Sequence, residues 1–168
     1  MWGMTHARNV EITVRRATEA DLPVLGRLGA LLLRMHYAFD RDRFMAPADN
    51  TDEGYAWFLG TQLHESDVAV FVADHEGTVV GYVYAAIEPQ SWKELREEAG
   101  FVHDLVVDDA SRRSGVAKAL MQVAQEWLRS RGMPRVVLGT ATANVPARRL
   151  FESLGFRETM VELTRELA

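Results

Sequence analysis

The sequence predicts a single domain of the α/β (α+β) class, with a mixed β-sheet of about six to seven strands and helices on both faces. Two β-rich runs, 68–74 and 78–87, are joined by the short turn His75-Glu76-Gly77, which is typical of an antiparallel hairpin. A buried strand, a basic turn and an amphipathic helix follow one another across Phe101–Met121. A strand over 135–140 follows this helix, so the two strands form a parallel βαβ unit.

The composition is that of an ordinary folded domain. At 168 residues the chain is long enough for one core, and we expect a domain over 10–168 after an N-terminal extension over 1–9. No run is apolar enough for a membrane span or a signal peptide, so we expect a cytoplasmic protein. The net charge of −5 argues against nucleic acid as a partner. The absence of cysteine excludes disulfides, thiolate metal sites and a cysteine acyl-enzyme, and no metal site is predicted.

The first half of the chain predicts a strand, two helices and a hairpin. The strand covers Val10–Arg16, and Thr18 and Asp21 then form a capping-box pattern at the start of a helix. Its apolar positions recur at helical spacing: Leu22, Leu25, Leu28, Leu32 and Met35. A polar loop over 40–50 precedes a second helix over 52–64, which presents Tyr55, Phe58, Leu59 and Leu63.

The second half predicts three helices and three strands. A short surface helix is expected over 89–100, with Trp92 and Leu95 as its large apolar residues. The helix after the basic turn ends at Gly132, and Pro134 prevents its continuation. A short helix over 144–154 follows the strand at 135–140, and an alternating strand over 156–167 closes the chain.

The junction inside Phe101–Met121 is the best candidate for a binding site. A strand that enters a helix through a tight turn directs free backbone N–H groups and the positive end of the helix dipole at one point, which suits a phosphate. The turn has one glycine, Gly115, and no Lys-Ser/Thr pair after it. It therefore matches neither the P-loop nor the dinucleotide-binding loop.

Two motifs carry a resemblance to a known family. The first is Arg112-x-x-Gly115-x-Ala117, preceded by Leu105-x-Val107, and the second runs from Asn144 through Ala147 and Phe151 to Gly155-Phe156. Together, and in this order, they resemble the two signature motifs of the GNAT superfamily of acyl-CoA-dependent N-acetyltransferases. The segment Val14–Leu22 looks like the first strand and helix start of these enzymes, so the resemblance covers nearly the whole chain.

The resemblance implies acetyl-CoA as cosubstrate and an amine as acceptor, with a possible homodimer. In this family the strand that carries Leu105, Val106 and Val107 splays from its neighbour and binds the pantetheine arm. The turn then wraps the pyrophosphate, here with Arg112, Arg113, Ser114, Gly115, Val116, Ala117 and Lys118, although Arg112 could instead be structural. Asn144, Ala147 and Phe151 would line the pantetheine channel. Asn144 could also cap the last helix.

The amine must lose a proton before it attacks, because its pKa is near about 10.4. Asp104 and His103 precede the cofactor segment, and the alternation of a regular strand would direct them to opposite faces. We favour Asp104 as the base, since family members often carry an acid there, with His103 and Glu88 as alternatives. Many relatives have a tyrosine as the acid where this chain has Phe151. Tyr82, Tyr84 and Thr142 are substitutes, and the acid stays open.

Three functions remain from the sequence: acetylation of a small cationic amine, acetylation of a protein N-terminus or lysine, and acyl-CoA binding without catalysis. Charge favours the first, because acids gather between Tyr37 and Asp67 and bases between Arg112 and Arg149. An acidic region could attract an amine and a basic one CoA, although both could be ordinary solvated surfaces. The acceptor itself and the acyl chain length stay open.

Overall fold

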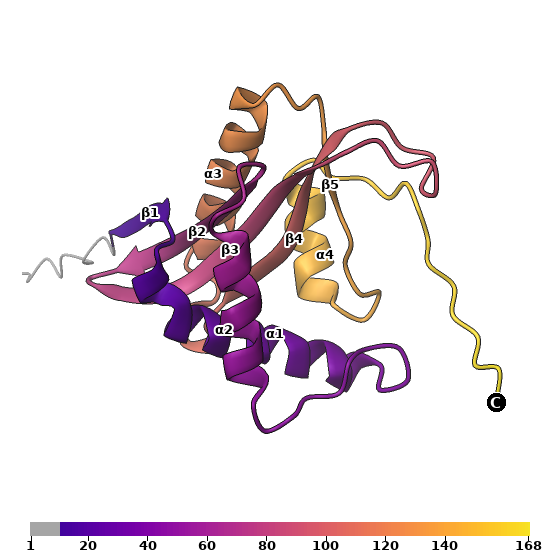
Figure 1. The fold of residues 1–168 in the computed structure, drawn as a ribbon, viewed down its shortest axis with the longest axis horizontal. Coiled ribbons are helices and arrows are strands. Elements are labelled where there is room, and N and C mark those ends of the chain that lie inside the picture. Colours follow the sequence, from indigo (N-terminus) through magenta and orange to yellow (C-terminus); the bar gives the residue numbers. More distant parts are fainter. Residues whose placement is uncertain (1–10) are drawn as a thin grey trace, which may run out of the picture.

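A five-stranded sheet lies between two layers of helices in the computed structural model, which describes residues 11–168 (Figure 1). The expected extension over 1–9 lies outside these residues. In chain order the elements are β1 (Ile12–Arg16), η1 (Glu19–Asp21), α1 (Leu22–Phe39), α2 (Thr51–Gln62), β2 (Val68–His75), β3 (Thr78–Glu88), β4 (Ala99–Val107), η2 (Asp109–Ser111), α3 (Val116–Ser130), β5 (Val136–Leu138) and α4 (Val145–Ser153).

The strands lie in sequence order, β1-β2-β3-β4-β5. Neighbours from β1 to β4 are antiparallel, and β5 runs parallel to β4. The predicted hairpin and the predicted βαβ unit are therefore confirmed, with α3 as the connection between β4 and β5. The mixed sheet with helices on both faces is confirmed as well.

Each face of the sheet has its own hydrophobic core. On one face, Leu25 and Leu28 of α1 and Leu59 of α2 pack in one cluster with strand residues such as Val72. On the other face, the buried stripe of α3 packs with Phe151 of α4. Full burial of a leucine stabilises the fold by roughly 1.5–3 kcal/mol, so the helical spacing of these residues is enough to hold the helices on the sheet.

Close contact between α1 and α2 depends on two glycines of α1. A Cβ at Gly26 would lie 2.3 Å from the carbonyl oxygen of Asp52, and one at Gly29 would lie 2.1 Å from Cδ1 of Tyr55. The absence of a side chain at Gly29 lets the Tyr55 ring lie directly on α1. The direction in which Tyr55 extends is therefore determined by the packing of these two helices.

The predicted helix over 89–100 is wrong. Residues 89–98 form a loop closed by the bridge between Ser91 and Arg96, and β4 already begins at Ala99. Trp92 and Leu95, the large apolar residues of the predicted helix, are 84% and 90% exposed. A helix of this length needs an apolar face buried against the core, and these two side chains supply none.

The predicted last strand over 156–167 is also wrong, because no strand follows α4. The sheet therefore has five strands rather than six to seven. The chain is extended after Phe156, but residues 157–168 make no backbone hydrogen bond in the structure. An alternating sequence forms a strand only beside a sheet edge with which its N–H and C=O groups can pair. No strand within residues 11–168 pairs with it.

Candidate active site

Free backbone donors gather at the start of α3, as the sequence predicts. Gly115 is the N-cap of α3 and has φ of +84°, in the left-handed region, and Arg113 has φ of +61°. The first hydrogen bond of the helix runs from the Ala119 N–H to the Gly115 carbonyl oxygen, and no N–H group of residues 113–118 donates to a backbone carbonyl. These amides and the helix dipole make the turn suited to a phosphate group.

The side chain of Arg112 turns back on its own loop. Its Nη2 lies 2.9 Å from Asp109 Oδ1, and its Nε donates to the Val107 carbonyl oxygen at 3.4 Å. Arg112 therefore makes contacts within its own loop, as its structural alternative expects. Arg113 and Lys118 are in no ion pair among residues 11–168, so they are the cations of this turn that remain open to an anion.

The strands β4 and β5 separate beside this turn. β5 pairs only with Gly100, Phe101 and Val102, whereas β4 continues to Val107. On its other side this last part of β4 pairs with β3 through Leu105, Val106 and Val107. On the side that faces away from β3, this last part of β4 pairs with no strand among residues 11–168, which is the splay that the family resemblance implies.

The helix α4 borders the same region and carries the second motif. Asn144 is its N-cap, and its Oδ1 accepts a hydrogen bond from the Ala147 N–H at 3.3 Å. Phe151 is buried in the core with Phe156 beside it. The capping role of Asn144 is confirmed, and Phe151 contributes a packed ring without a hydroxyl group.

A β-bulge at His103 changes the expected arrangement of the candidate bases. Tyr84 pairs with Asp104 and Ala85 with Val102, so His103 is the extra residue of β4. The His103 ring lies 4.9 Å from that of Tyr84, and Asp104 also bonds to residues on this face of the sheet. The prediction that strand alternation directs His103 and Asp104 to opposite faces is therefore wrong.

Two tyrosine hydroxyls converge on Asp104. Tyr55 of α2 and Tyr82 of β3 each donate to Asp104 Oδ2 at 2.8 Å. Asp104 is only 9% exposed, and both of these hydrogen bonds are made to Oδ2, with no hydrogen bond to Oδ1 from the side chains of residues 11–168. One oxygen of the carboxylate is held in place, and the other is available for a proton.

Burial raises the pKa of Asp104, while the hydrogen bonds from Tyr82 and Tyr55 lower it in part. Burial, with the charge of Asp104 nearby, also raises the pKa of Tyr55 and of Tyr82 well above the usual value. The two phenols therefore stay protonated as donors. Tyr82 is fully buried, so its hydroxyl is held as a donor to Asp104 and is closed to solvent.

His103 and Glu88 form a second, more exposed pair at the end of β3. His103 Nε2 lies 2.8 Å from Glu88 Oε1, and the ring of Phe101 stacks on the His103 ring at 5.6 Å between centroids. All three predicted bases thus lie on one face of the sheet. Sequence reasoning missed Tyr55 as their neighbour, because no local pattern links α2 to a carboxylate 49 residues away.

The charge segregation seen in the sequence is partly cancelled in space. Asp52 pairs with Arg34 at 3.1 Å, and Asp67 pairs with Arg131 of the basic region at 2.8 Å. Asp40 accepts hydrogen bonds from backbone N–H groups of its own turn. Fewer free acids therefore border the α1–α2 connection than the sequence alone suggests.

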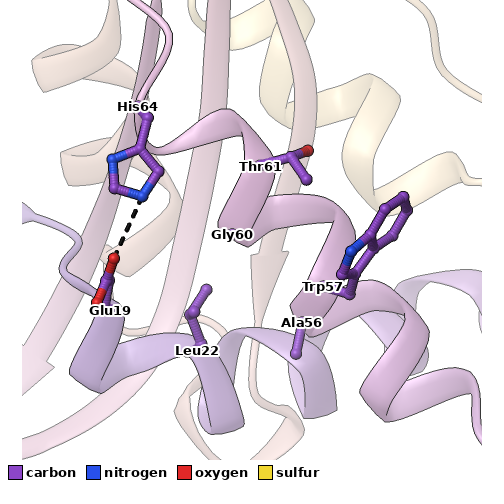
Figure 2. A pocket seen from close by; sticks show the side chains of 7 residues that line it. All are labelled: Glu19, Leu22, Ala56, Trp57, Gly60, Thr61 and His64. Atoms are coloured by element: carbon purple, nitrogen blue, oxygen red, sulfur yellow. Dashed lines mark ion pairs between the residues drawn. The ribbon is translucent and has the colours of Figure 1, made fainter.

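A shallow hollow lies apart from these groups. Figure 2 shows Leu22, Trp57 and Thr61 around it, with His64 Nε2 3.2 Å from Glu19 Oε1 at one end. It shares no residue with the Asp104 cluster or with the turn before α3. Within residues 11–168 no group of side chains could hold a metal ion, and no helix is long and apolar enough to span a membrane.

The fold and these two sites define an α/β protein with free backbone N–H groups at the junction of β4 and α3 and a buried carboxylate on β4. The model of the Acetyltransferase (GNAT) family matches residues 32–156, so the chain belongs to this family of acetyltransferases. It is 37% identical to human N-acetyltransferase 8 over 97 residues, which are 58% of this chain and 42% of that protein.

Two matches that cover most of this chain have lower sequence identity. The chain is 27% identical to the N-alpha-acetyltransferase of Sulfurisphaera tokodaii over 157 residues, 90% of this chain and 83% of that protein. Its fold is similar to that of the aminoglycoside N-acetyltransferase AAC(6')-Iy, solved with CoA, with a TM-score of 0.76, 22% identity and coverage of 97% and 99% of the two chains. The chain spans about half the length, or less, of the other first curated relatives, several of them mycothiol acetyltransferases.

Proposed function

We propose that this protein transfers an acetyl group from acetyl-CoA directly to a primary amine in a ternary complex, and that the acceptor is a small cationic amine. One observation carries the proposal: the free backbone N–H groups at the start of α3 follow the part of β4, after Val102, that does not pair with β5. A pyrophosphate and an amide-rich arm are the parts of CoA that such groups can bind.

In this mechanism Asp104 takes the first proton. The ammonium group of the acceptor loses a proton to Asp104 Oδ1, directly or through water, and the neutral nitrogen attacks the thioester carbonyl carbon. The C–S bond then breaks, and the second proton of the nitrogen passes through water to the departing sulfur, so that CoA leaves as a thiol. The raised pKa of Asp104 supports this role, because a base works best when its pKa is nearer the working pH.

Two observations support a cationic acceptor. Neighbours by fold include aminoglycoside acetyltransferases, whose acceptors carry several amines. Asp49 and Glu53, beside or within the first turn of α2, are in no ion pair among residues 11–168, and their field would favour a cation. A favourable field of this kind weakens as salt is added, because the charges are exposed.

A protein N-terminus is the second candidate acceptor. It is favoured by the match to the N-alpha-acetyltransferase of Sulfurisphaera tokodaii, which covers most of both chains. An acyl-CoA-binding protein without catalysis is the remaining alternative, supported by the replacement of the family's tyrosine by Phe151.

Release of thiol from acetyl-CoA with a panel of amines separates these functions. The panel should hold polyamines, aminoglycosides, neutral amines and short peptides with free N-termini, and the lack of cysteine means that the protein adds no thiol signal. We expect the fastest release with a polycationic amine, and a rate that falls as salt increases. Preference for the peptides would support the second candidate, whereas CoA binding without thiol release from any amine would refute the enzymatic proposal.

A further inference from the structure

Glu88 carries a second carboxylate on the face of the sheet that holds Asp104. It is the last residue of β3, four positions after Tyr84, and Tyr84 pairs with Asp104 across β3 and β4. A strand rises by about 3.3 Å per residue, so the two carboxylates are on the order of 10 Å apart. Figure 1 shows this end of β3 and β4 extending beyond α2. The Glu88 carboxylate therefore lies past the helix whose tyrosine binds Asp104.

The charge of Glu88 is not taken up by a basic side chain. His103 Nε2 lies 2.8 Å from Glu88 Oε1, and no side chain of residues 11–168 donates to Oε2. Arg96 lies close by, but its Nε pairs with Glu94 at 2.9 Å and its Nη1 reaches only the backbone carbonyl oxygen of Glu88. Within the described residues, then, no lysine or arginine forms an ion pair with the Glu88 carboxylate. One of its oxygens is left for a cation from outside the chain.

Aromatic rings fill the space between the two carboxylates. The Tyr84 ring lies 4.9 Å from the His103 ring and 6.0 Å from the Phe58 ring, measured between centroids. Phe101 stacks on His103 at 5.6 Å. Tyr84 is buried at the centre of these rings, whereas Phe58 is 38% exposed and His103 is exposed as well. The floor between the carboxylates is thus made of ring faces and edges, and ring faces attract cations.

This floor offers few hydrogen bonds to a ligand. The Tyr84 hydroxyl donates to Gln62 Oε1 at 2.9 Å. Burial, together with the charges of Asp104 and Glu88, raises the pKa of Tyr84 to about 12, so the hydroxyl keeps its proton for this bond. The phenylalanine rings have no polar atom to offer. A chain of methylene groups suits such a floor better than a sugar ring, whose hydroxyl groups would lose water without gaining partners.

We propose that Glu88 and His103 form a second subsite of the acceptor site, which binds the far ammonium group of a linear diamine or polyamine while the near amine lies at Asp104. The methylene chain between the two nitrogens lies over the rings around Tyr84. Glu88 is then a binding residue, and Asp104 remains the base. This inference rests on the proposed function, because it names which class of cationic amine is the acceptor.

The length of the acceptor gives the first test and requires no variant. Each α,ω-diamine from diaminopropane to diaminododecane is compared with the alkyl monoamine of the same length. We expect kcat/KM to rise by about 10- to 100-fold over the monoamine once the chain spans the two carboxylates, which corresponds to one hydrogen bond between charged groups. Shorter diamines should show no such gain. A gain of the same size at every length, or at none, would overturn the proposal.

Removal of the Glu88 charge gives the second test. Glu88→Gln keeps the size of the side chain and its ability to bond to His103, and it should abolish the gain of long diamines over monoamines. Glu98→Gln is the matched control, because it removes the charge of an exposed acid just before β4, and it should keep the gain. An equal loss of kcat/KM for monoamines and diamines in Glu88→Gln would contradict a subsite for the far amine.

Binding separates this inference from the proposed function. Calorimetry of the amines with the CoA-loaded protein reports on the subsite alone, because CoA carries no acetyl group to transfer. We expect long diamines to bind about 10- to 100-fold more tightly than monoamines, and this difference to disappear in Glu88→Gln.

The two failures then look different. Acetylation of monoamines without any preference for long diamines would overturn only the second subsite. Tight binding of long diamines without thiol release from acetyl-CoA would refute the proposed function and leave the subsite in place. Neither binding nor release would refute both.

Discussion

Removing the hydroxyl of Tyr55 should shift the pH dependence of the reaction. Tyr55→Phe deletes one of the two hydrogen bonds to Asp104 Oδ2, each 2.8 Å long, and leaves the ring in place against α1. Those bonds stabilise the charged form of Asp104 and oppose the effect of burial. The variant should therefore raise the pKa of Asp104 further, and the base should be protonated over more of the pH range.

The size of the shift follows from the strength of the bond. A hydrogen bond to a charged group is worth about 1.5–3 kcal/mol, and one pKa unit corresponds to about 1.4 kcal/mol. Loss of the Tyr55 bond should then raise the pKa of Asp104 by roughly one to two units. Below that pKa, the rate should fall about tenfold for each pH unit, since only the ionised carboxylate accepts a proton.

The assay is the pH profile of kcat/KM for the best amine, measured by thiol release. The acidic limb should move to higher pH in Tyr55→Phe, with CoA affinity unchanged. Tyr84→Phe is the matched control, because the Tyr84 hydroxyl donates to Gln62 Oε1 and not to Asp104. An acidic limb that stays in place in Tyr55→Phe, or that moves equally in Tyr84→Phe, would refute the coupling between Tyr55 and the base.

Three further predictions concern the proposed base, the residue that supports it and the proposed cofactor turn. Asp104→Asn should lower turnover by roughly 10²-fold or more. The free energy of unfolding at neutral pH should not fall. Because the pKa of Asp104 is raised in the folded protein, its ionisation destabilises the protein as pH rises through that pKa, whereas asparagine carries no charge. A clear drop in the urea midpoint would instead indicate a structural carboxylate. Gly29→Ala should displace the Tyr55 ring, shift the acidic limb as Tyr55→Phe does, and lower stability by roughly 1–3 kcal/mol; an unchanged limb would contradict this. Gly115→Glu should weaken CoA binding, measured by calorimetry, more than Gly115→Gln does. Glutamine has the same shape and suffers the same backbone strain at φ of +84°, but it carries no charge. Equal CoA affinities of the two variants would argue against a phosphate at this turn.

The sequence by itself determined the local features of this protein. Hydrophobic spacing predicted α1, α3 and the central hairpin, and the order of strand, helix and strand predicted the parallel pairing of β4 with β5. The turn of free amides before α3 was predictable for the same reason, because Gly115 and the amides that follow it are neighbours in the chain. Each of these depends on residues within one or two elements, so the physical cause is visible in a short window of sequence.

The tertiary structure alone decided which distant groups meet. The bulge at His103 has no marker in the sequence, since it arises from the register of β4 against β3, and it brings His103 and Asp104 to one face. The approach of Tyr55 to Asp104 depends on how α2 packs at Gly29. Residues 157–167 have the pattern of a strand but do not form one, because the pattern specifies which side chains a strand can bury, whereas a partner edge must supply its hydrogen bonds.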